Sequence, residues 1–73
     1  MKTYSVHFKN AYSNKIIIVA ADNALQAVND CIIRYTERDL HGNIYIPENN
    51  NFTAELIENV YSKKSGIKQV INL

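Results

Sequence analysis

Residues 15–21 read KIIIVAA, and this run decides the fold because so many consecutive apolar side chains cannot remain in water. Isoleucine and valine favour β-strands, and successive side chains of a strand point to opposite faces of a sheet. The two faces are both apolar, with Ile16, Ile18 and Ala20 on one side and Ile17, Val19 and Ala21 on the other. We interpret the run as a central strand that the rest of the chain must cover.

A second strand precedes this run. Residues from Thr3 to Lys9 alternate between polar and apolar side chains, which is typical of a half-buried strand. Tyr4, Val6 and Phe8 form its apolar side. Residues 10–14 are of types that accept turn conformations. The two strands are therefore predicted to form an antiparallel hairpin.

A helix is predicted after the central strand. Asp22 and Asn23 can cap free backbone N–H groups, and Gln26 stands three residues after Asn23 as in a capping box. Gly42 supplies a left-handed stop, so we expect the helix to end near residues 38–41. The core-facing stripe at helical spacing consists of Ala24, Leu25, Val28, Cys31, Ile32 and Tyr35.

The remaining chain predicts three further elements. Asn43–Ile46 is a candidate short strand, ended by the only proline of the chain. From Thr53 onward the apolar residues are spaced as in a second amphipathic helix, which Gly66 would close. A strand over the same residues would place Glu58 among apolar side chains, so we favour the helix. Residues 67–73 are predicted to be a last strand.

The order β-β-α-(β)-α-β predicts a single α+β domain over residues 1–73. We expect a small sheet of three to four antiparallel or mixed strands, with two helices on one face. A chain of 73 residues buries only about 60% of the surface of its unfolded state, so its stability is modest.

Composition excludes several classes of function. A net charge of +1 produces no long-range field that would gather phosphate backbones or anionic lipids. No apolar run approaches the roughly 18 residues of a membrane span, so we expect no membrane partner. A single cysteine and an N-terminus without a secretory pattern indicate a cytoplasmic protein. The frequent Ile, Asn, Lys and Tyr residues are typical of AT-rich coding sequences, and they favour a low-GC bacterium, its phage or a mobile element.

Residues that could carry chemistry are few. His7 lies on the polar side of the first strand, and His41 stands at the predicted helix end, where an imidazole suits the helix dipole. Cys31 falls on the core stripe of the first helix, where it acts as a small hydrophobe. No spacing indicates a metal site, a phosphate loop or a pair of catalytic carboxylates. We therefore expect a protein that is not an enzyme and has no cofactor and no metal.

The leading hypothesis is a small non-catalytic protein-binding module. If both helices cover one sheet face, one apolar pair of the central strand faces away and needs another molecule to cover it. The outward pair is either Ile16 and Ile18 or Ile17 and Val19. As contact residues we take Ile17, Val19 and also Ile33, which lies on the polar side of the first helix. The partner would be a second copy of the chain or a larger host machine. In the second case the protein would be a phage or mobile-element inhibitor of the anti-defence type.

The alternative hypothesis is a small nucleic-acid-binding module. Its contact residues would be His7, Lys9, Lys63, Lys64 and Lys68 around an exposed aromatic ring. A net charge of +1 makes this function less favourable than protein binding.

Overall fold

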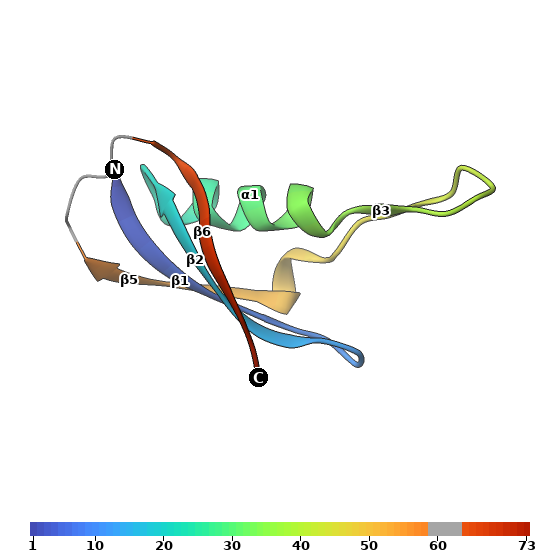
Figure 1. Cartoon of the computed structure of the whole chain (residues 1–73), viewed down its shortest axis with the longest axis horizontal. Coiled ribbons are helices and arrows are strands. Elements are labelled where there is room, and N and C mark those ends of the chain that lie inside the picture. The colour runs from blue at the N-terminus through green and yellow to red at the C-terminus, as the bar shows by residue number, and fades with distance from the viewer. Residues whose placement is uncertain (59–63) are drawn as a thin grey trace.

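The chain folds as an α+β protein in the computed structural model, which describes residues 1–58 and 64–73 (Figure 1). Four strands form an antiparallel sheet in the order β5-β1-β2-β6, and two short strands form a second sheet. The elements are β1 (Lys2–Lys9), β2 (Asn14–Ala21), α1 (Ala24–Tyr35), β3 (Glu37–Arg38), β4 (Ile44–Tyr45), the 3-10 helix η1 (Asn49–Asn51), β5 (Phe52–Glu58) and β6 (Gly66–Asn72). The predicted α+β class is confirmed, and the predicted number of helices is not.

The predicted hairpin is present at the centre of the sheet. β1 and β2 pair in a continuous antiparallel register that runs from Lys2 opposite Ala21 to Lys9 opposite Asn14. Asn10 shapes the connecting turn, because its side-chain oxygen accepts hydrogen bonds from the backbone N–H groups of the two residues that follow Ala11. The alternation of residues 3–9 therefore gives the correct strand and the correct buried side.

The core lies between this sheet and α1. Figure 1 shows the helix packed along one face of the sheet. Asn23 caps the helix as predicted, because its side chain accepts the backbone N–H of Gln26 at 2.8 Å. The buried apolar residues in contact are Tyr4, Val6, Phe8, Ile17, Val19, Ala21, Ala27, Cys31 and Phe52. The buried side of the helix is thus centred on Ala27 and Cys31, whereas Ala24 and Leu25 of the predicted stripe are exposed.

The first helix ends earlier than predicted. It stops at Tyr35, and Thr36 adopts an extended conformation while its hydroxyl donates a hydrogen bond to the Ile32 carbonyl at 2.7 Å. The next residues form β3, which pairs with β4 instead of continuing the helix. Gly42 does adopt a positive φ of 82°, but it serves the turn between these two strands.

The predicted second helix is wrong for its described part, which is the edge strand β5. Its register contains a β-bulge, since Leu56 pairs with Tyr4 while Glu58 pairs with Thr3. The extra residue, Ile57, shifts the alternation by one position. Glu58 therefore lies on the face opposite α1 and not among the apolar side chains, which removes the objection to a strand. Val60, Tyr61 and Lys63 lie outside the described residues.

The sheet face opposite α1 is called the open face below. Ser5 and His7 alternate with core residues along β1, and Ile16 and Ile18 alternate with core residues along β2, so all four lie on this face. Ile71 lies there too, because it pairs with Ile16. In the described part of the chain, no helix covers it (Figure 1). Ile16 and Ile18 are half-buried by their neighbours, so their exposure costs less than complete exposure would.

Candidate functional site

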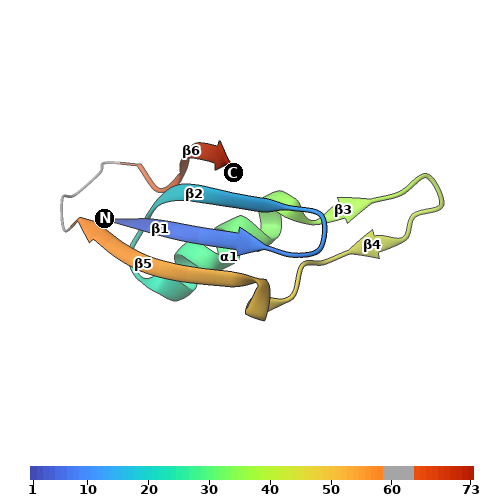
Figure 2. The ribbon, with the colours of Figure 1, turned by 90° about the horizontal axis from the view of Figure 1, so that it is seen from below.

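A hairpin arm extends from the end of α1, away from the main sheet. It consists of β3, β4 and the residues between them, and Figure 2 shows it reaching well beyond the sheet and the helix. Asp39 organises its turn. Its carboxylate accepts hydrogen bonds from the backbone N–H groups of His41 and Asn43, both at 2.9 Å, and from the Asn43 amide at 3.0 Å. The Tyr45 hydroxyl donates a further hydrogen bond to it at 3.1 Å.

These hydrogen bonds give Asp39 a charge-dependent role in the arm. They lower its pKa, and the largest cause is the hydrogen bond from the Asn43 side chain. A carboxylate whose pKa is lower in the folded than in the unfolded state stabilises the fold above its unfolded pKa. That contribution is lost as the pH falls through the native pKa. The arm is therefore expected to loosen as the pH falls through the native pKa of Asp39.

Asp39→Asn is expected to loosen the arm at neutral pH. An amide keeps one acceptor oxygen but replaces the other with a donor, so it cannot receive the hydrogen bonds from both Asn43 and Tyr45. The backbone amides of His41 and Asn43 should exchange with solvent faster, as measured by hydrogen-exchange NMR, while the melting temperature changes little. Glu48→Gln, at an exposed carboxylate outside the arm, is the matched control. Unchanged exchange in Asp39→Asn would contradict this account of the turn.

The arm carries apolar side chains that the described part of the chain leaves exposed. Leu40 at the tip is fully exposed, and Ile46 at the base is 65% exposed. Ile33, in the last turn of α1 beside the base of the arm, is 73% exposed. Ile44 and Tyr45 on β4 are also more than half exposed. Exposed apolar side chains gathered on one element are characteristic of contact sites in soluble proteins.

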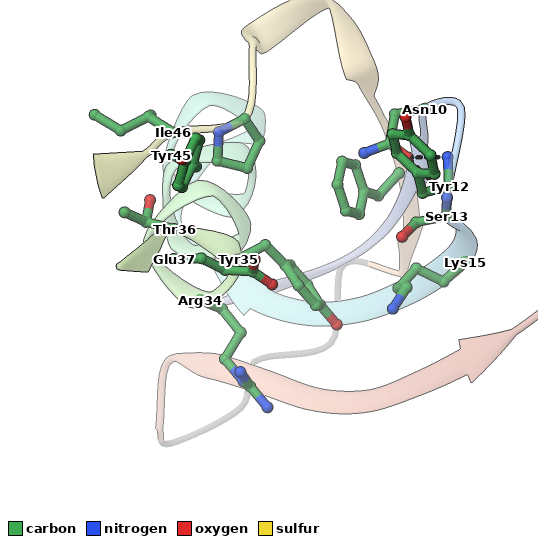
Figure 3. Close-up of a pocket in the computed structure, with 12 residues that line it drawn as sticks. Asn10, Tyr12, Ser13, Lys15, Arg34, Tyr35, Thr36, Glu37, Tyr45 and Ile46 are labelled. Carbon is green, nitrogen blue, oxygen red and sulfur yellow. Dashed lines mark hydrogen bonds between the residues drawn. The ribbon is translucent and has the colours of Figure 1, made fainter. Parts of the chain in front are cut away.

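A groove of about 680 Å³ lies between the base of the arm and the β1–β2 turn (Figure 3). Tyr12 and Ser13 come from the turn on one side, while Tyr45 and Ile46 come from the arm on the other. Its full lining is Phe8, Asn10, Tyr12, Ser13, Lys15, Arg34, Tyr35, Thr36, Glu37, Tyr45, Ile46 and Pro47. The groove and the arm thus form one continuous surface, which we call the arm–groove surface.

Aromatic rings and two cations give the groove its chemistry. The Phe8 ring stacks on Phe52 at 4.5 Å between centroids and contacts Tyr35 at 5.2 Å, which ties the groove to the core. The Lys15 ammonium and the Arg34 guanidinium lie 5.0 and 5.5 Å from the centre of the Tyr35 ring. Such cation–π contacts hold both charges in the groove with their donors still available.

The structure corrects the predicted partner-contact residues of the central strand. Ile17 and Val19 are completely buried beneath α1. The pair that faces away from the helix is Ile16 and Ile18, because the hairpin register sets them opposite His7 and Ser5. Neither Ile17 nor Val19 can reach a partner without unfolding. Ile33 is exposed, as its position on the polar side of the helix predicts.

The predicted nucleic-acid contacts do not converge on one site. His7 lies on the open face, where its Nε2 donates to Asn14 Oδ1 at 2.6 Å. Lys9 is the last residue of β1, next to the β1–β2 turn, whereas Lys64 precedes β6 at the opposite end of the sheet. Lys68 occupies the β6 bulge, two strands away from β1. Lys63 lies outside the described residues.

Cys31 is a core residue. It is completely buried between the helix and the sheet. Burial, together with the smaller effect of the nearby negative charge of Asp30, raises the pKa of its thiol to about 12. Among the described residues, no three His, Cys, Asp or Glu side chains lie close enough together to hold a metal ion.

The native Cys31 thiol is expected to resist alkylation by iodoacetamide at neutral pH. Only the thiolate reacts, and both the raised pKa and the burial suppress it. Mass spectrometry should show slow modification of the folded chain and complete modification in urea. Rapid modification of the folded chain would show that the helix does not cover this side chain as described.

Comparisons of the chain with protein-family models, with curated proteins and with solved structures found no match. Within residues 1–58 and 64–73, no helix combines the length and the apolar character that a membrane span requires.

Sequence reasoning missed the arm and most of the groove. The sequence pattern predicts a helix end at Leu40 and a short strand at Ile44 and Ile46, and this interpretation does not bring the three side chains onto one exposed element. The available signal was the string from Asp39 to Asn43, in which Asp, Gly and Asn occur within five residues, as hairpin loops require.

Proposed function

We propose that this protein is a non-catalytic protein-binding module that docks through the arm–groove surface. The observation that carries the proposal is the arm itself, whose turn is held by four hydrogen bonds to Asp39 while Leu40, Ile44 and Ile46 remain exposed. Apolar residues on a preorganised element lose little conformational entropy on binding, which favours their use as contact residues.

The groove supports this function with a different kind of contact. Tyrosine and arginine are the residue types most often found at energetic hot spots of protein interfaces. The groove presents Tyr12, Tyr35, Tyr45 and Arg34 next to the arm. A partner segment can thus bury the aliphatic tip of the arm and rest on aromatic rings at its base.

A catalytic function has less support from this surface. The described lining of the groove contains one carboxylate, Glu37, and neither histidine nor cysteine. Histidine is the most frequent acid–base group, and a serine, lysine or tyrosine such as those in the lining needs an adjacent base or a lowered pKa to act as a nucleophile. We therefore keep the proposal that the protein acts by binding.

The proposed setting is the cytoplasm of a low-GC bacterium, where a phage or mobile-element product of this size would act as an accessory or inhibitor of a host machine. The support for this setting is compositional: frequent Ile, Asn, Lys and Tyr residues, together with a single buried, free cysteine.

Affinity capture with matched variants tests the docking surface. The wild type, a Leu40→Asp/Ile44→Asp variant and a Leu25→Asp variant would be immobilised and exposed to one bacterial lysate. Leu25 is an exposed leucine in the first turn of α1, at the far end of the helix from the arm, so it controls for the added charge. We expect a protein that the wild type and Leu25→Asp retain and that the arm variant loses.

Two outcomes would contradict the proposal. Equal retention by all three chains would place the contact elsewhere, and loss in Leu25→Asp but not in the arm variant would place it on α1. Circular dichroism of each variant shows that the fold is intact. Where the captured partner is pure enough to titrate, a hot-spot position predicts an affinity loss of about thirtyfold or more, corresponding to about 2 kcal/mol.

Nucleic-acid binding remains the second candidate, with Lys15 and Arg34 in the groove as its one supporting observation. Two cations beside aromatic rings can hold a short single strand. A gel shift with single-stranded oligonucleotides at low salt separates the two functions. The protein-binding proposal expects no shift, because the described lysines outside the groove do not gather on one surface.

A further inference from the structure

Within residues 1–58 and 64–73, no strand pairs with the outer side of β6. The strand order β5-β1-β2-β6 places β6 at one edge, with β2 as its neighbour. The backbone N–H of Leu73 donates to the Asn14 carbonyl at 2.9 Å, and Ile71 pairs with Ile16. Hydrogen-bonded and non-hydrogen-bonded pairs alternate along an antiparallel ladder. The backbone groups of Ile71 and Leu73 therefore face β2, and those of Val70 and Asn72 face outward.

The two edges of the sheet differ in how well they are protected. β5 carries two carboxylates, Glu55 and Glu58, besides its bulge, and both features oppose pairing with another strand. β6 has its bulge and its one charge together at Lys68, near its start. From Gln69 onward it is uncharged, and Val70 and Ile71 are partly exposed. The second half of β6 is thus an unprotected strand edge.

We propose that two copies of this chain pair through the second half of β6, antiparallel and centred on Ile71. In this register the outward N–H and C=O groups of Val70 in one copy form hydrogen bonds with those of Asn72 in the other copy. By symmetry, Asn72 of the first copy pairs in the same way with Val70 of the second. Ile71 then stands opposite its own copy in a non-hydrogen-bonded pair, the arrangement that brings side chains closest. No two charges oppose each other, since Lys68 lies beyond the paired residues.

The side chains of the open face favour the same partner. Ile71 pairs with Ile16 on that face, and Ile18 follows two residues along β2. A two-fold axis perpendicular to the sheet places both open faces on the same side. The apolar strips of the two copies therefore meet at the junction, and each covers part of the other. A foreign strand would satisfy the backbone groups but would not supply this matching strip.

The size of the contact predicts a weak dimer. Specific stable interfaces bury roughly 1,200–2,000 Å² in total, and pairing of one short strand from each copy lies at or below the low end of that range. We therefore expect monomer and dimer to exchange with concentration. This inference is independent of the arm–groove surface, and its tests use the purified chain alone.

Amide exchange of the wild-type chain tests the inference without any substitution. Raising the protein concentration should slow the exchange of the Val70 and Asn72 amides, measured residue by residue by NMR. The Gln69 and Ile71 amides should be protected at every concentration, because they bond to β2. Exchange at Val70 and Asn72 that does not depend on concentration would overturn the proposal.

Cysteine cross-linking tests the register. Two Ile71→Cys chains would place their Cα atoms about 4.5 Å apart, within the range of about 4.4–6.8 Å that a disulfide spans. Mild oxidation should convert this variant to a covalent dimer. Gln69→Cys is the control, since the proposed register separates its two copies by about 13 Å along the strands at about 3.3 Å per residue. Equal cross-linking of both variants would exclude the register.

A proline variant tests the outward backbone group. Val70→Pro removes an N–H that does not bond to β2, so the sheet should persist while the dimer is lost. Val70→Thr keeps the N–H and the β-branched shape, and it should dimerise like the wild type. Analytical ultracentrifugation measures both, and circular dichroism verifies folding. A dimer that survives in Val70→Pro, or a wild type that stays monomeric while its β6 edge takes up a foreign peptide strand, would contradict self-pairing.

Discussion

Ile17→Ala is expected to lower the free energy of unfolding by about 2–5 kcal/mol, the range for removing a fully buried isoleucine side chain. Ile17 is completely buried between the sheet and α1, at the centre of the core. The substitution removes apolar contacts and leaves a cavity that a close-packed interior fills only in part. A domain of this size has a total stability near the low end of roughly 5–15 kcal/mol, so the substitution should remove a large share of it.

Ile18→Ala provides the matched comparison at the next position of the same strand. Ile18 is only half-buried and lies on the open face, so its truncation leaves no enclosed cavity and should cost clearly less. Urea denaturation followed by circular dichroism measures both values. A larger loss for Ile18→Ala than for Ile17→Ala would reverse the two faces of β2 and contradict the packing of α1 described above.

Phe8→Ala is expected to cost about 3–5 kcal/mol and to disturb the groove at the same time. The Phe8 ring stacks on Phe52 and contacts Tyr35, so it joins β1, β5 and the end of α1. Aromatic pairs of this kind add about 0.5–1.5 kcal/mol to the effect of burial alone. Without the ring, Tyr35 loses its support, and with it the position of the two cations that lie over it.

Tyr12→Ala is the control for Phe8→Ala because both residues line the groove. The Tyr12 side chain is 97% exposed, so its removal should leave the free energy of unfolding within about 0.5 kcal/mol of the wild type. Comparing the two variants separates the structural role of Phe8 at the floor of the groove from the proposed binding role of Tyr12 at its rim. Similar destabilisation by both substitutions would show that the β1–β2 turn packs more closely than the exposure of Tyr12 implies.

The sequence predicts the fold best where the local residue pattern agrees with the tertiary packing. The alternation of Tyr4, Val6 and Phe8 predicts both the strand and its buried side, because one face of β1 is in the core and the other is polar. The cap at Asn23 is equally readable, since a side-chain acceptor before an apolar helical pattern has a direct physical role. The central strand is identified correctly, but which of its two apolar faces meets the helix is not.

The second helix was mispredicted because a β-bulge cannot be read from periodicity. A regular strand would have put Glu58 among apolar residues, and that conflict favoured a helix. The inserted residue Ile57 resolves the conflict by shifting the alternation once, a feature that depends on pairing with β1. The choice between Ile16 with Ile18 and Ile17 with Val19 also depended on which face α1 covers, a tertiary property.

The candidate site was the least predictable part of the molecule. The arm is specified by only two pairs of strand residues and by the contacts of Asp39, and apolar residues near its turn resemble the end of a helix. The groove joins residues from the β1–β2 turn, the end of α1 and the base of the arm, which are far apart in the sequence. Only the fold brings them together.

The central claim is that the arm docks on a partner protein, and site-specific photo-cross-linking tests it most directly. A photoreactive amino acid would replace Leu40 at the tip of the arm or Leu25 at the start of α1, and each protein would be irradiated in the same bacterial lysate. Both positions are exposed leucines, so general surface reactivity is matched. The account predicts a covalent adduct with one protein at position 40 and none at position 25. If a protein is cross-linked at position 25 and none is cross-linked at position 40, the account is contradicted.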